Sequence, residues 1–235
     1  MSHLSWGSIG LRLNGDFSSA QIISDRGSSW PVNGLLTACQ SAYYAAAEKV
    51  GYHKRDILVD RVEDARDAQQ DAEEEFQSAL EQLSELISFD GGELQAVYED
   101  LSDSYEQSLA AAETVSSRID AIGDVSEALF AEWETEIEEF SNARFKSESS
   151  AKLRETKRRY DKMFAVMRKS EQRMQPVLVA LKDNVLYLKH NLNARAVAAL
   201  KVEFGRIEKD IAALVAEMRR SIASSNQFIE SMQTP

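Results

Sequence analysis

The chain has 235 residues, a single cysteine and a formal net charge of −12 at pH 7. This negative charge argues against general nucleic-acid binding, which requires a basic face that displaces counterions from the phosphates. No run of residues approaches the roughly 18 apolar positions of a membrane-spanning helix, and one cysteine cannot form an internal disulfide.

The distribution of proline predicts long helices. The three prolines are Pro31, Pro176 and Pro235, so residues 32–175 contain none. Proline is the strongest helix breaker, and the remaining composition is dominated by Ala, Glu, Leu, Gln, Ser, Arg and Lys. We therefore expect an all-α fold, an elongated antiparallel helical bundle or coiled coil of about four long helices.

The first 34 residues differ from the rest of the chain. They hold five of the ten glycines and many serines, and they show no helical period. Such a composition is typical of irregular chain. We expect residues 1–38 to be an irregular start or signal region, and residues 39–235 to form a single elongated α-helical domain.

A stripe of mostly apolar residues begins the helical part and repeats every 3.5 residues on average. This period is typical of a coiled-coil seam. The helix is expected to end at residues 89–92 (FDGG), where glycine allows the positive φ of a tight helix exit. The stripe consists of Leu58, Val62, Ala65, Gln69, Ala72, Phe76, Ala79, Leu83 and Leu86.

A second stripe starts directly after this turn. It keeps its phase across Gly123 and Asp124, which favours one helix, straight or kinked, over two. With a four-residue turn between them, the first two helices should pack as an antiparallel hairpin. The second stripe consists of Leu94, Tyr98, Leu101, Tyr105, Ser108, Ala112, Val115, Ile119, Ile122, Ser126, Leu129, Trp133, Ile137 and Phe140.

Two further stripes complete the bundle. Residues 141–147 are predicted to be a turn, Pro176 is expected to kink the third helix without ending it, and Asn193 is expected to cap the fourth. The third stripe is Leu153, Thr156, Tyr160, Met163, Met167, Ser170, Met174, Val177, Leu181, Val185 and Leu188. The fourth is Val197, Leu200, Phe204, Ile207, Ile211, Leu214, Met218, Ile222, Ser225, Ile229 and Met232.

Charge is unevenly distributed among these segments. Residues 60–139 hold 25 acidic and three basic residues, a net charge of −22, whereas residues 144–173 hold 11 basic and four acidic residues, a net charge of +7. Two interpretations remain open. The basic third helix packs beside the acidic hairpin and fixes which helices pair, or it offers a docking face for an acidic partner or anionic lipid. The cations at residues 53–55 lie near the start of the first helix, where they oppose the helix dipole. They are either an unremarkable patch or a contact for lipid headgroups.

The residues that catalysis or metal binding requires are missing from the sequence patterns. The histidines are His3, His53 and His190, with no Glu-x-x-His pair, no zinc-ligand spacing and no phosphate-binding loop. A Cys39–His53 pair would need a third orienting group and a pocket. We therefore expect no enzyme activity, no metal and no cofactor. The tyrosines and methionines of the stripes, Tyr98, Tyr105, Tyr160, Met163, Met167 and Met174, are interpreted as core residues.

The stretch Leu36-Thr37-Ala38-Cys39 has the form of a bacterial lipobox. In such sequences small residues before the cysteine allow cleavage by a signal peptidase, and the thiol is lipidated. Gln40 follows the cysteine, and by resemblance a residue other than Asp there favours the outer membrane of Gram-negative bacteria. The predicted lipidation site is Cys39.

Three stretches beyond the lipobox resemble the DUF2959 family of bacterial lipoproteins, whose function is unassigned. These stretches are SAYYAAAEKVGYHKRDILVDRVEDARDAQQ, ALFAEWE and VLYLKHNLNARAVAAL, and the similarity extends over residues 35–232. The family resemblance implies a bacterial protein of the cell envelope. With Gln40 after the lipobox cysteine, we expect it to be lipid-anchored at the periplasmic face of the outer membrane, with no transmembrane helix. The resemblance implies no catalytic residue, and only Cys39 can be carried over from the family.

The residues before the lipobox depart from the lipoprotein pattern. A signal peptide needs a basic start and an apolar segment directly before the cysteine, whereas residues 24–34 (SDRGSSWPVNG) are polar and include Pro31. Our hypothesis is that residues 1–34 reflect a wrong start or reading frame and that the native leader is encoded elsewhere. Sequencing the upstream DNA tests this.

Together these observations predict a non-enzymatic envelope lipoprotein that acts as a periplasmic helical interaction or spacer module. Its partners would be the membrane, through lipid on Cys39, and a protein partner or a second copy of the chain, but not nucleic acid. One alternative is a soluble, self-associating coiled-coil adaptor. An uncharacterised enzyme is the other alternative, because the family that the chain resembles has no assigned function.

Overall fold

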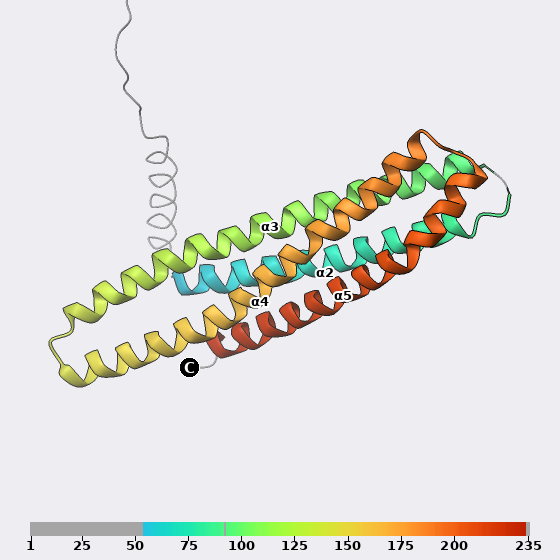
Figure 1. The fold of residues 1–235 in the computed structure, drawn as a ribbon. Coiled ribbons are helices and arrows are strands. Elements are labelled where there is room, and N and C mark those ends of the chain that lie inside the picture. The colour runs from blue at the N-terminus through green and yellow to red at the C-terminus, as the bar shows by residue number, and fades with distance from the viewer. Residues whose placement is uncertain (1–53, 92, 234–235) are drawn as a thin grey trace, which may run out of the picture. The chain divides into compact units, whose positions relative to one another are not determined.

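The computed structural model describes residues 54–91 and 93–233. The chain divides into two units, Met1–Ala42 and Tyr43–Pro235, and all of the described residues belong to the second. They form α2 (Lys54–Ile87), α3 (Leu94–Glu139), α4 (Ala143–Lys189) and α5 (Ala194–Gln233), with no strand among them (Figure 1). The predicted all-α helical bundle is confirmed.

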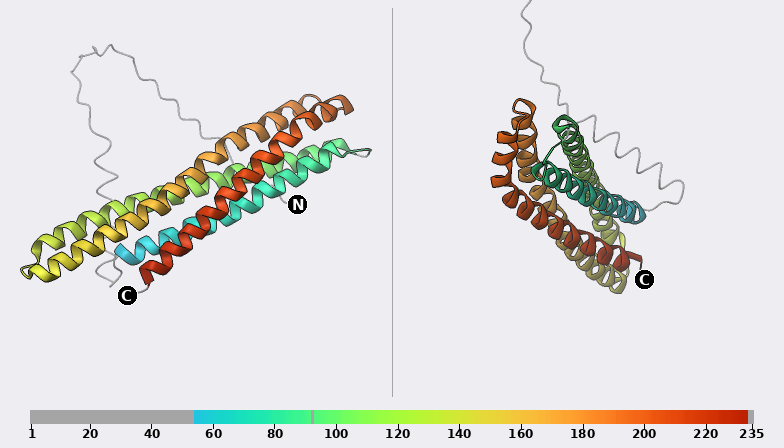
Figure 2. Two further views of the ribbon diagram at one scale, coloured as in Figure 1. Left: turned by 60° about the horizontal axis from the view of Figure 1, so that its bottom comes forward. Right: turned by 90° about the vertical axis from the view of Figure 1, so that its right-hand side faces the viewer.

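Each helix packs against two neighbours, in the cyclic order α2, α3, α4, α5. Lys54 forms an ion pair with Glu132 of α3 (Nζ–Oε1, 2.8 Å), and Arg66 donates a hydrogen bond to Asn226 of α5 (3.3 Å). The start of α2, the α3–α4 turn and the end of α5 therefore lie at one end of the bundle, which we call the proximal end. The α2–α3 and α4–α5 turns lie at the other end, the distal end (Figures 1 and 2).

Short turns that hold their own hydrogen bonds connect the helices. Asn142 caps α4, because its side-chain oxygen accepts from the backbone N–H groups of Arg144 (2.9 Å) and Phe145 (3.4 Å). The helix therefore begins at Ala143, and the turn predicted over residues 141–147 was too long. Asn193 caps α5 in the same way, as predicted, by accepting from the N–H groups of the second and third residues after it (3.0 and 3.1 Å).

Two residues that often end helices lie inside long ones. Gly123 is in the interior of α3, so the preserved phase of the second stripe did indicate one helix. Pro176 is in the interior of α4, which continues to Lys189, as predicted. At the α2–α3 turn Gly91 has φ +156°, a conformation that L side chains rarely adopt, which agrees with the predicted glycine-dependent exit.

The predicted stripes form the core. Every residue of the first and third stripes is buried, and the second and fourth are buried apart from a few partly buried positions. Phe140 is the exception: it follows the end of α3, is 41% exposed and lies edge-on to Phe145 with 6.5 Å between the ring centroids. The buried surface also extends beyond each stripe to Phe130, Leu178 and Phe228, because each helix contacts two neighbours and not one.

An aromatic cluster joins three helices near the proximal end. The ring of Tyr160 in α4 lies 5.4 Å from Phe130 of α3, 5.2 Å from Phe164 and 6.4 Å from Phe228 of α5, between centroids. The Ser126 hydroxyl donates to the Tyr160 hydroxyl (2.7 Å) and also lies 2.8 Å from the carbonyl oxygen of Gly123 in its own helical turn. Burial raises the pKa of Tyr160, although the bond with Ser126 opposes this effect.

Candidate functional site

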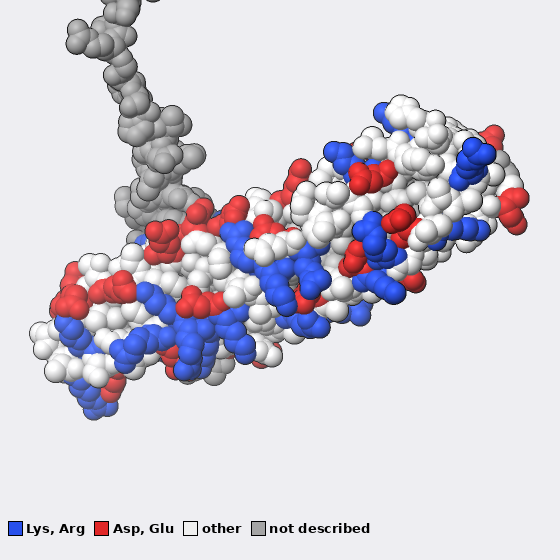
Figure 3. Space-filling view, viewed as in Figure 1, with Lys and Arg blue, Asp and Glu red and all other residues white. Residues whose placement is uncertain are grey.

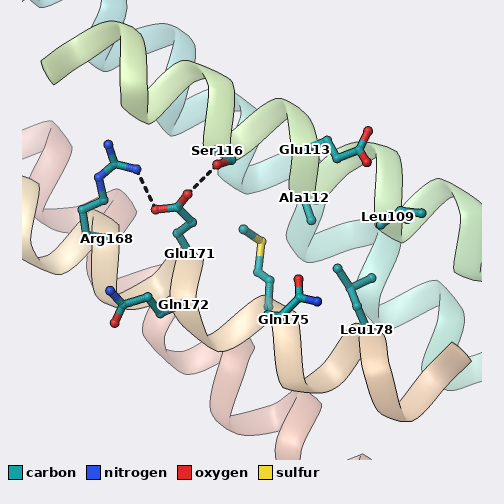
Figure 4. A pocket seen from close by; sticks show the side chains of 10 residues that line it. Leu109, Ala112, Glu113, Ser116, Arg168, Glu171, Gln172, Gln175 and Leu178 are labelled. Carbon is teal, nitrogen blue, oxygen red and sulfur yellow. Dashed lines mark hydrogen bonds and ion pairs between the residues drawn. The ribbon is translucent and has the colours of Figure 1, made fainter. Parts of the chain in front are cut away.

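A groove between α3 and α4 has a volume of about 530 Å³ (Figure 4). Leu109 and Ala112 line it from α3, and Met174 and Leu178 line it from α4. Its remaining lining is polar and comprises Glu113, Ser116, Arg168, Glu171, Gln172 and Gln175. We call it the α3–α4 groove. It combines an apolar strip with amide and charged groups along its rim.

Glu171 bridges the two helices at one end of this groove. Its carboxylate accepts from the Ser116 hydroxyl (2.5 Å) and from the Arg168 guanidinium (2.9 Å), as the dashed lines in Figure 4 mark. Arg168 also donates to Asp120 of α3 (2.5 Å) and lies over the ring of Phe164. The charges at this end of the groove are therefore partnered within the protein, and they serve to join α3 to α4.

The hydrogen bonds at this end of the groove also keep Arg168 positively charged. Burial alone would lower the pKa of Arg168, but its hydrogen bonds with Asp120 and Glu171 outweigh burial and raise it. Arg168 is thus a permanent cation that pairs with carboxylates of both helices, Asp120 of α3 and Glu171 of α4.

A second hollow, of about 560 Å³, lies between α4 and α5 towards the distal end. Its lining includes Tyr187, Leu200 and Val202 together with Asp183 and Arg206. Val202 is 81% exposed and Tyr187 is 42% exposed, so this hollow presents apolar side chains to solvent. We call it the distal hollow.

A buried carboxylate ties α4 to α5 midway along the bundle. Glu217 accepts from Lys169 of α4 (3.0 Å) and from Arg220 one turn further along α5 (2.8 Å). The hydrogen bond from Lys169 is the main cause of its lowered pKa, and the charge of Arg220 adds to the effect. Glu217 therefore stays ionised and acts as a fixed structural partner.

The predicted pairing of the basic third helix with the acidic second helix is present. Lys146 pairs with Glu138 (2.6 Å) and Lys157 with Glu134 (2.5 Å), in addition to the pair between Arg168 and an aspartate of α3. These ion pairs all connect α4 with α3. Only Lys146, Lys157 and Arg168 of α4 form these ion pairs with α3. The second interpretation, a docking face for an acidic partner or anionic lipid, therefore concerns the remaining basic residues of α4.

Some of the residues singled out in the sequence lie outside the described part of the chain and others lie within it. Cys39 and His53 lie outside it, so lipidation and the considered Cys–His pair remain predictions. Lys54 forms its ion pair with α3. Of the tyrosines and methionines interpreted as core residues, Tyr98 is partly buried. The others are buried: Tyr105, Tyr160, Met163, Met167 and Met174.

Several residues of the two hollows were not singled out from the sequence. Ser116 and Glu171 lie off the predicted stripes and carry no motif that would have marked them. Tyr187 and Val202 also lie off the stripes, and that position was a readable signal, because an apolar residue outside the seam of an amphipathic helix faces solvent.

Among the residues that the structure describes, no group of three or more His, Cys, Asp and Glu side chains in the four helices is arranged to hold a metal ion. None of these helices combines the length and apolar character needed to cross a membrane.

One comparison with known proteins gives a match. The family model described as a protein of unknown function, DUF2959, matches residues 43–232, which include nearly all of the four described helices. No curated protein and no solved structure matches the chain.

Proposed function

The chain belongs to the DUF2959 family, and from this premise we propose that it is a bacterial envelope lipoprotein whose bundle acts as an interaction or spacer module. Lipid on Cys39 would hold it at the periplasmic face of the outer membrane. The proposal assigns no catalytic role to any residue.

The position of the lipobox carries this proposal. Leu36-Thr37-Ala38-Cys39 ends four residues before the family match begins at residue 43. A mature chain that starts at Cys39 would therefore carry the whole family region directly behind its lipid. Two or more acyl chains on one cysteine are sufficient for stable membrane attachment, whereas a single chain binds only marginally.

The length of the bundle supports a role as a spacer or as an interaction module. Its helices contain 34 to 47 residues, which corresponds to lengths of about 50 to 70 Å at 1.5 Å per residue. Among the polar side chains of the α3–α4 groove, Ser116, Arg168 and Glu171 are held in place by contacts within the protein. Such a bundle presents a pre-formed surface along the length of its helices.

Metabolic labelling with a fatty-acid analogue tests the anchor. A working lipoprotein leader is joined to Leu36, so that secretion does not depend on residues 1–34. We expect label in the parent chain and none in Cys39→Ser. Gln40→Asp is the matched control: it should keep the label but move the protein to the inner-membrane fraction. A secreted parent chain that takes up no label would contradict the proposal.

A second candidate function is a self-associating adaptor, and the distal hollow favours it. The exposed Val202 and Tyr187 would be covered if a second copy packed there. Sedimentation velocity of the unlipidated Cys39→Ser chain should then show a concentration-dependent dimer that Val202→Lys weakens. The neighbouring change Lys201→Gln is the control, and a monomer at every concentration would exclude this candidate.

A further inference from the structure

A third hollow, of about 210 Å³, lies between α4 and α5 towards the proximal end. Arg159 and Lys162 line it from α4, and Ser224, Gln227, Phe228 and Ser231 line it from α5. None of these six residues is acidic. Phe228 is almost completely buried (3% exposed), so the polar residues are the ones that meet solvent. We call this hollow the basic pocket.

The lining offers donors suited to an oxyanion. Lys162 has no hydrogen bond or ion pair with the described part of the chain, and the same is true of the side chains of Ser224 and Gln227. Arg159 pairs with Glu155 one turn earlier in α4, which leaves part of its guanidinium fork for a second partner. Two cations with hydroxyl and amide donors match the charge and geometry of a phosphate group.

The surroundings of the pocket are also basic. Besides the two lining cations, the same stretch of α4 exposes Lys152, Arg154 and Arg158, and of these only Arg158 lies within ion-pair distance of a carboxylate of the described residues, 4.0 Å from Glu155. Residues 152–162 hold six basic residues against two acidic ones, Glu155 and Asp161. Figure 3 shows Lys and Arg gathered over α4, whereas Asp and Glu gather along α3 beside it. The local field at the pocket is thus positive, although the whole chain carries a net charge of −12.

The pocket lies at the end of the bundle where the described chain begins. The hydrogen bond between Arg66 and Asn226 places this part of α5 against the early turns of α2. Lys54, the first described residue, follows Cys39 by 15 positions, a span of at most roughly 50 Å even for extended chain. If Cys39 is lipidated, as proposed above, phospholipid headgroups come within reach of the pocket.

We propose that the basic pocket binds a phosphate-type anion, the group shared by anionic phospholipid headgroups and free phosphate. Arg159 and Lys162 supply the charge, and Ser224 and Gln227 supply further hydrogen bonds. The basic pocket is separate from the lipid on Cys39. If the bound anion is a phospholipid headgroup, the protein would contact the membrane surface at a second point.

The test uses the full chain with Cys39→Ser, so that the result does not depend on lipidation. One arm titrates inorganic phosphate and follows amide chemical shifts by NMR. The other measures cosedimentation with vesicles of phosphatidylcholine alone or mixed with phosphatidylglycerol. We expect saturable shifts at residues 159–162 and 224–231, and binding to the mixed vesicles only. Because the chain is acidic overall, binding to anionic vesicles requires a local site.

Three variants separate a site from a general charge effect. Lys162→Gln should weaken binding about fivefold, the effect of one cation near an anionic surface, and Ser224→Ala should weaken it without changing the charge. Lys182→Gln removes an exposed lysine of the same helix outside the pocket and should leave binding unchanged. Circular dichroism verifies that each variant remains helical.

Each outcome decides the proposal. Phosphate-induced shifts without vesicle binding would support it and identify a soluble anion as the source. Vesicle binding that Lys162→Gln weakens, without shifts from free phosphate, would support it and identify the headgroup. Equal losses in Lys162→Gln and Lys182→Gln, or no response in either arm, would overturn it, whether or not Cys39 carries lipid.

Discussion

Gln69 is the one polar residue in the first seam, and its side chain is completely buried. Neither its amide nitrogen nor its amide oxygen has a hydrogen-bond partner among the described residues. Ser170 of α4 and Ser221 of α5 are buried and unpartnered in the same way. The contacts Arg66–Asn226, Glu73–Arg219 and Lys169–Glu217 place all three at a similar level of the bundle. The core therefore contains a polar layer.

Gln69→Leu should stabilise the protein. The substitution keeps a side chain of similar size and removes an amide whose burial without partners costs about 1–3 kcal/mol. We expect the free energy of unfolding in urea, followed by circular dichroism, to rise by about that amount. Gln70→Leu, at the exposed neighbouring position, is the control and should change stability by less than about 0.5 kcal/mol.

A loss of stability in Gln69→Leu would show that the amide is hydrogen-bonded in solution, for instance through buried water. A gain in stability would show that the polar layer costs free energy. In coiled coils a polar residue at a seam position fixes the register of the helices at such a cost. The stabilised variant should then show broader amide signals by NMR if the layer has that role.

At the scale of the element, the seams, the glycine-dependent exit after α2 and the Asn193 cap were readable from the sequence, whereas the start of α4 and the second contact face were not. A 3.5-residue repeat identifies the residues that point inward, and nearly all of them are buried. Phe130, Leu178 and Phe228 were missed because they lie beside the seam and are buried only when a second neighbour is present. The α3–α4 turn was predicted too long, because Ser, Asn and Lys in residues 141–147 favour turns, while the Asn142 cap allows the helix to start early.

The groove and the basic pocket depend on tertiary structure, which the sequence pattern does not contain. Arg159 and Ser224 are 65 positions apart in the chain, and only the packing of α4 on α5 brings them to one hollow. The predicted stripe gave the inward face of both helices but not their relative axial offset. That offset depends on contacts such as Lys169–Glu217 and Tyr160–Phe228, which a single sequence does not reveal.

The caps of the helices are each expected to contribute measurably to stability. Asn193→Ala removes the acceptor for two backbone N–H groups at the start of α5 and should cost about 1 kcal/mol in urea unfolding. Asn193→Asp retains an acceptor and adds a negative charge that interacts favourably with the helix dipole, so it should keep most of the stability. Equal losses in both variants would mean that the amide N–H donors matter and not the oxygen.

At the scale of the whole bundle, charge and connectivity reinforce one another. Short turns make consecutive helices neighbours, and the ion pairs from α4 to the acidic α3 favour the same arrangement. Closing the cycle between α2 and α5 then requires only contacts such as Glu73–Arg219, at 2.6 Å between the charged atoms. The unequal charge of the segments thus supports the observed order of helices, while the outer basic residues of α4 remain available to solvent.

The α2–α3 and α4–α5 turns lie at the distal end, opposite the α3–α4 turn, and this placement has a mechanical consequence. If the chain is held through residues that precede α2 and a partner pulls on the α4–α5 turn, the load runs along the helix axes. The α2–α3 and α4–α5 hairpins would then have to slide past each other, and many rows of core side chains would resist at once. A pull at the α3–α4 turn and the start of α2 would instead separate the helices one turn at a time. The same bundle would be stiff in the first direction and easily opened in the second.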